Sequence, residues 1–200
     1  MPMTREQLER LTETDVRDLI PADVLLSALA SSPFIPSTSL VNIRDLGSVP
    51  GSAIHPSWKS SLRLAAPMAF VKSISRSSTY TNLPSGPYSS TCAIDLTNTF
   101  CSTVQSLAGA NPEDVRFDYM LSRIGTEPVR EMLLSYARIS AGVTFDHPGF
   151  YNMCSLRASC WDAFVAGVHE EHGGWGGYVT KTLGFSSDDL AIIRSNLRFK

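Results

Sequence analysis

The sequence predicts an α/β fold in a single domain spanning residues 1–200, with short strands in the N-terminal third and helices through most of the rest. Two observations favour this fold class. Runs with strand character occur at Leu40–Ile43 and Ser61–Ala66, and the first leads to Gly47 and a Pro50-Gly51 turn. Well-marked helix starts then recur along the C-terminal half. A chain of 200 residues is long enough to bury a substantial core.

The helix starts carry recognisable capping residues. Thr4 to Gln7 fits a capping box that opens an amphipathic segment through Leu19. Asn111-Pro112 places a capping side chain before a proline at the first helical position, and acids follow. Further helices are expected at residues 25–29, from Cys92 to Gly109 and after Thr126. Another is expected from Leu156 to Glu171, where Gly173-Gly174 ends it, and a last one begins after a capping Ser186.

Composition excludes several classes of partner. The formal net charge is −2, so no basic excess indicates a nucleic acid or an anionic membrane. No apolar run approaches the roughly 20 residues that span a bilayer. The N-terminus is polar, unlike a signal peptide, and a cytoplasmic location is expected. We expect no cofactor.

A metal site is also not expected. The cysteines Cys92, Cys101, Cys154 and Cys160 form no C-x-x-C pair, and free thiols are the simplest interpretation. His169 and His172 lie three apart near the expected end of a helix, whereas the zinc-protease pattern needs histidines four apart on one face. The helix dipole stabilises a histidine near a helix C-terminus, so no metal is needed to explain these two residues.

Several segments share the pattern of one family. Asn42 to Gly47 is similar to the opening signature of the atypical tyrosine/serine protein phosphatases of fungal and bacterial type. Asp118 to Arg130 resembles their helix pair, and Gly173 to Ser186 their C-terminal signature. The resemblance covers residues 34–67 and about 104–200. It implies a cysteine-phosphatase-like fold, and the short connection between the two parts implies a small, truncated central sheet.

The family's phosphate-binding loop, written HCTAGKDRTG, falls on Ser89 to Asn98 in the register that the resemblance implies. Ser90 then stands at the position of the nucleophilic cysteine and Leu96 at that of the arginine. Asp95 and Thr97 match the family at their positions. The loop is therefore a vestigial one, with no intact catalytic residue.

A cysteine phosphatase needs a thiolate, which the loop amides and the following helix stabilise, and an arginine six residues later to grip two phosphate oxygens. Six residues after the four cysteines of this chain stand Asn98, Leu107, Cys160 and Ala166. The spacing C-x5-R is therefore absent. Serine is a poor substitute because an alcohol is not appreciably ionised without a dedicated base.

Four residues outside the loop are candidates for anion binding. Arg44 and Asp45 belong to the opening signature, where a structural ion pair between them is favoured over substrate contact. Arg63 lies where the family has an Arg-Ser pair and is a candidate anion ligand or a solvated arginine. Arg123 is favoured as a structural buttress of the former loop.

The leading functional hypothesis is a pseudophosphatase that binds or regulates, with a phosphorylated protein or a small molecule as ligand. A second is a scaffold reassigned to another small-molecule reaction, for example in fungal metabolism, with Asp95, Arg44 or Arg63 as acid, base or anion-holding groups. A third is a mis-spliced or truncated form of an active phosphoric monoester hydrolase. The divergent segment 70–104 suggests this third hypothesis, because residues 73–110 are crowded with Ser and Thr and hold only two charges.

Overall fold

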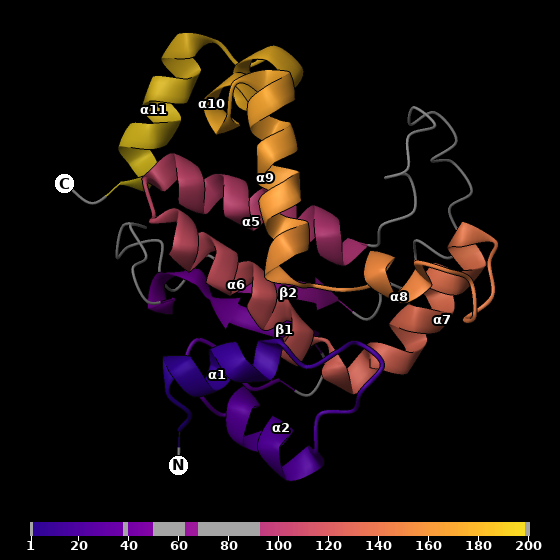
Figure 1. Ribbon diagram of the computed structural model, residues 1–200. Helices are drawn as coiled ribbons and strands as arrows, with labels where there is room; N and C mark the ends of the chain where they lie inside the picture. The colour runs from indigo at the N-terminus through magenta and orange to yellow at the C-terminus, as the bar shows by residue number, and fades with distance from the viewer. Residues whose placement is uncertain (1, 38–39, 50–62, 68–92, 199–200) are drawn as a thin grey trace.

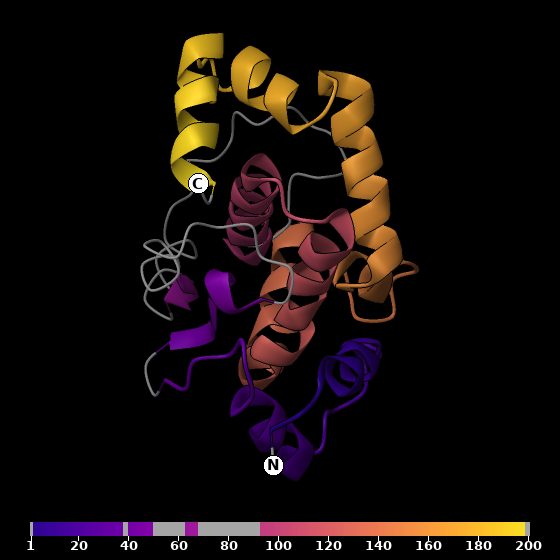
Figure 2. The same ribbon diagram turned by 90° about the vertical axis from the view of Figure 1, so that its left-hand side faces the viewer.

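Helix α6 (Pro112–Gly125) packs against several of the other helices and against one strand. In the computed structural model, which describes residues 2–37, 40–49, 63–67 and 93–198, this helix runs through the middle of the molecule (Figures 1 and 2). It contacts α1 (Arg5–Thr12), α2 (Ala22–Leu29), β1 (Leu40–Asp45), α5 (Ala93–Ala108) and α9 (Ala158–His172). Segments from both halves of the chain therefore pack on one helix.

The sequence of α6 explains its start and its two buried stripes. The Asn111 side chain accepts a hydrogen bond from the backbone N–H of Glu113, and Pro112 occupies the first turn, as predicted. One stripe is apolar and spaced for a single helix face; its members are Phe117, Leu121 and Ile124. A second buried stripe is polar and has Asp114, Asp118 and Ser122 at intervals of four residues.

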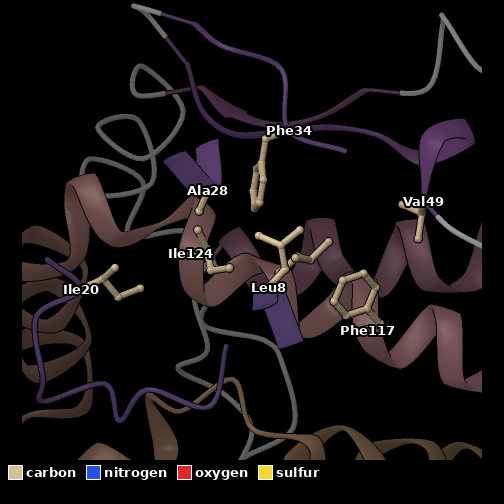
Figure 3. Close-up of a cluster of buried hydrophobic side chains, with 8 residues drawn as sticks. Leu8, Ile20, Ala28, Phe34, Val49, Phe117 and Ile124 are labelled. Carbon is tan, nitrogen blue, oxygen red and sulfur yellow. The ribbon is translucent and has the colours of Figure 1, made fainter. Parts of the chain in front are cut away.

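The apolar stripe of α6 forms the largest described core cluster together with the N-terminal elements. Figure 3 shows Leu8 of α1, Ala28 of α2 and Phe34 of the following loop converging on Ile124. The remaining members of the cluster are Ile20, Val49, Phe117 and Leu121. Because burial of a large aliphatic or aromatic side chain contributes about 1.5–3 kcal/mol, this cluster is a major source of stability.

Both predicted strands are present where the structure describes the chain, they pair with each other, and β1 is irregular at its centre. β1 pairs antiparallel with β2 (Arg63–Pro67), with Val41 opposite Ala66 and Arg44 opposite Leu64. The register shifts between these two pairs, where Asn42 has a φ of 59°. Asparagine tolerates this left-handed conformation better than most residues. The bulge places the Asn42 and Arg44 side chains next to α6.

A short segment pairs with the other edge of β1. The N–H of Ile35 donates to the carbonyl of Ile43 at 3.0 Å, and the N–H of Asp45 donates to the carbonyl of Pro33 at 3.0 Å. β1 is therefore hydrogen-bonded on both sides, and the short 3-10 turn η1 (Leu46–Ser48) follows it.

The N-terminal helix is shorter than predicted. The Thr4 capping box is confirmed, but α1 ends at Thr12, and the predicted continuation through Leu19 is wrong. The Thr12 hydroxyl donates to the carbonyl of Glu9 at 2.6 Å, and the Asp15 carboxylate accepts from the N–H of Arg17 at 2.9 Å. Such local side-chain bonds compete with the helix ladder. Leu19 is accordingly 70% exposed instead of joining a helical core face.

The C-terminal half is helical, as expected. The predicted helix after Cys92 is confirmed as α5, and the glycine-terminated helix as α9, whose C-cap Gly173 has a φ of 74°. The Ser186 capping box begins α11 (Ser187–Leu197). The remaining elements are η2 (Glu127–Val129), α7 (Arg130–Ala141), α8 (Phe150–Met153), α10 (Trp175–Gly177) and the π-helical turn η3 (Tyr178–Thr182).

The architecture is thus rich in helices, with a two-stranded sheet in the part of the chain that the structure describes. This composition is compatible with an α/β phosphatase-like domain. Residues 70–92 of the divergent segment lie outside the described residues, whereas its end, from Ala93 onward, forms the start of α5.

The contact between β1 and α6 requires a glycine at position 125. A Cβ atom on Gly125 would lie 2.1 Å from Asn42 Oδ1 and 3.0 Å from Asn42 Cα, so neither side chain nor backbone leaves room for it. We predict that Gly125→Ala lowers the free energy of unfolding by about 2 kcal/mol, because the strand must move away from the helix. Urea denaturation measures this change.

Gly167→Ala is the matched control. Gly167 also lies inside a helix, and a Cβ there meets nothing within 4 Å. Since alanine is the better helix former, this variant should be stabilised by up to about 1 kcal/mol. Equal effects of the two substitutions would contradict the close approach of β1 to α6.

Candidate functional site

The vestigial loop maps to the beginning of α5. Ser90 lies outside the described residues, and the backbone of Asp95, Leu96 and Thr97 is helical within α5, which begins at Ala93. The side chains of these three residues are outside the described part of the structure. The predicted loop register therefore places its second half on the first turns of a helix.

Arg44 is completely buried, and each of its three guanidinium nitrogens donates to a protein oxygen. Its Nε donates to Asp118 Oδ1 at 2.9 Å, its Nη2 donates to Ser122 Oγ at 3.2 Å, and its Nη1 donates to Asn42 Oδ1. The side chains of Arg44 and Asp118 are 0% and 2% exposed. An arginine held in this way joins β1 to the polar stripe of α6, and its guanidinium group does not face solvent.

The predicted pairing of Arg44 with Asp45 is replaced by the pairing with Asp118. Asp45 instead accepts hydrogen bonds from the N–H of Gly47 and the hydroxyl of Ser48, each at 3.0 Å. It thereby caps η1 at the end of β1. Adjacent residues of a strand point to opposite faces, which explains why neighbours in sequence take different partners.

Arg123 is also buried, and it holds the irregular segment between α1 and α2. Its Nε donates to the carbonyl of Thr14 at 3.1 Å, and its Nη2 donates to the carbonyls of Asp15 and Asp18 at 3.1 and 2.7 Å. Its Nη1 pairs with Glu127. The predicted structural role fits these contacts, although the segment that Arg123 supports is the N-terminal one.

Glu127 and Arg130 extend this cluster and were not singled out from the sequence. Glu127 Oε1 accepts from the N–H of Ile20 at 3.0 Å, and Arg130 Nη1 donates to the carbonyl of Val16 at 2.8 Å. The two side chains lie 3.6 Å apart at Arg130 Nε and Glu127 Oε1. The spacing of Arg123, Glu127 and Arg130 at four and three residues was the available signal, since side chains at these spacings are neighbours where the chain winds helically. In the structure the three residues belong to α6, η2 and α7 in turn.

Arg63, the fourth candidate for anion binding, belongs to β2 opposite Asp45. Its side chain lies outside the described part of the structure, so its anion-binding role stays a prediction.

The Cys101 thiol lies close enough to Asp118 and Arg44 for both charges to act on its ionisation. Burial, with a smaller contribution from the Asp118 charge, raises the pKa of Cys101 to about 12, and the Arg44 charge opposes this rise. Cys101 is 4% exposed and carries no disulfide. A thiol in this state is a core side chain and not a nucleophile.

The histidines at the end of α9 take part in local contacts. His172 Nδ1 lies 3.1 Å from Thr182 Oγ1, and the His172 ring meets Tyr178 edge to face at 5.3 Å. Among the residues that the structure describes, no group of three or more His, Cys, Asp or Glu side chains is arranged to hold a metal ion. No described helix is both long and apolar enough to cross a membrane.

Comparison with known proteins identifies the class. The model of the tyrosine phosphatase family matches residues 95–199, which form more than half of the chain, from the first turn of α5 to the end of α11. The chain therefore belongs to the tyrosine phosphatase family. The match begins after Ser90, and the opening signature at residues 42–47 lies outside it. The chain matches no curated protein and no solved structure.

The buried pair of Arg44 and Asp118 gives a test by substitution. We predict that Asp118→Asn lowers the free energy of unfolding by about 3–5 kcal/mol, because it leaves a buried guanidinium charge without its counter-ion. Chemical denaturation measures the loss. Asp162→Asn removes one partner of an exposed pair with Arg116 at 3.5 Å and should cost less than about 1 kcal/mol. Similar losses for both variants would show that the Arg44 pair is not buried in solution.

The state of Cys101 gives a second test. With a pKa of about 12, on the order of one Cys101 thiol in ten thousand is ionised at pH 8, and the side chain is also inaccessible. We predict that iodoacetamide modifies Cys101 at least about 100-fold more slowly than Cys160, which is partly exposed. Mass spectrometry of peptides resolves the two rates. In denaturant the rates should become equal, and equal rates in the folded protein would contradict the burial of Cys101.

Proposed function

We propose that this member of the tyrosine phosphatase family has lost cysteine-dependent hydrolysis and acts as a pseudophosphatase with a binding or regulatory role. The observation that carries the proposal is the absence of an arginine six residues after any of the four cysteines. Hydrolysis by this mechanism needs both groups, since the thiolate attacks phosphorus and the arginine binds the phosphoryl oxygens in two places.

The described side chains support the same proposal. Cys101 lies in the core with a raised pKa, so it offers no thiolate. Arg44 and Arg123 have their N–H groups bonded to protein oxygens, and neither guanidinium group is free to replace the missing arginine of the loop. The family's fold can thus persist while the chemistry is absent, because fold does not determine function.

We further propose that the fold is cysteine-phosphatase-like with a reduced central sheet, and that the protein works in the cytoplasm with a phosphorylated protein or a small molecule as ligand. The free thiols of Cys101 and Cys160 are consistent with a reducing compartment.

We predict that the purified protein does not turn over aryl phosphates. It would be assayed with a chromogenic aryl phosphate and with a phosphotyrosine peptide, beside an active cysteine phosphatase. The expected rate is that of the buffer, because no C-x5-R pair is available. The control variant is Cys92→Ser, which should have the same background rate. Robust turnover that Cys92→Ser abolishes would overturn the proposal.

Restoring the missing pair tests whether a phosphate cradle persists. In Ser90→Cys/Leu96→Arg, the new arginine would stand on the first turn of α5. We predict little gain in turnover or in vanadate binding, because Ala93 and Ile94 replace the Gly and Lys of the family's loop, and glycine is the residue that permits a close approach of backbone to an anion. Ser90→Cys alone is the matched control, since it supplies the thiol without the clamp. A strong gain in both measurements, confined to the double variant, would show that the cradle is intact.

A further inference from the structure

We draw no further inference here: the strongest candidate, the largely apolar groove between α2, β1 and η2 that is lined by residues such as Leu29, Phe34, Val41 and Val129, carries nothing because nothing in the structure shows what covers it.

Discussion

The buried ion pair between Arg44 and Asp118 is the interaction on which the arrangement of the strands on the helices depends. Removing two charges from water is costly, and the cost is offset only when the charges meet each other and their remaining hydrogen-bonding groups are satisfied. Here Asn42 and Ser122 supply the further partners of the guanidinium group. The geometry also needs the bulge at Asn42 and the missing side chain at Gly125, which together let β1 lie against α6.

A second buried cluster, at the C-terminal end of α6, follows the same principle. Arg123 and Arg130 donate to carbonyl oxygens of residues 14–18, and Glu127 accepts from the N–H of Ile20. These contacts pair backbone groups of a segment that forms no regular structure, among them the carbonyl of Val16 and the N–H of Ile20, whose hydrogen bonds are buried. Arg44 and Arg123 therefore support the fold, and this use competes with anion binding because each N–H can serve few acceptors at once.

Much of the helical structure was predictable because its signals are local. The caps at Thr4, Asn111 and Ser186 and the glycine end of α9 act within a few residues, and each lies where the sequence predicts. The end of α1 was missed because the apolar periodicity predicts a longer helix. The side-chain hydrogen bonds of Thr12 and Asp15 compete with the backbone hydrogen bonds that would continue it. The partner of Arg44 was missed because Asp118 lies 74 residues away along the chain, and only the packing of β1 on α6 brings them together. The four-residue spacing of Asp114, Asp118 and Ser122 does indicate a polar stripe on one helix face. It does not specify which basic side chains pair with that stripe.

Direct trapping of a covalent intermediate tests whether this member of the tyrosine phosphatase family lacks a phosphoryl-accepting cysteine. The protein would be mixed with excess aryl phosphate, quenched in acid within milliseconds to minutes, and analysed by intact-mass and peptide mass spectrometry, beside an active cysteine phosphatase treated in the same way. We predict that no cysteine of this chain gains the mass of a phosphoryl group at any time, while the active enzyme does. A phosphorylated cysteine at any of positions 92, 101, 154 or 160 would contradict it.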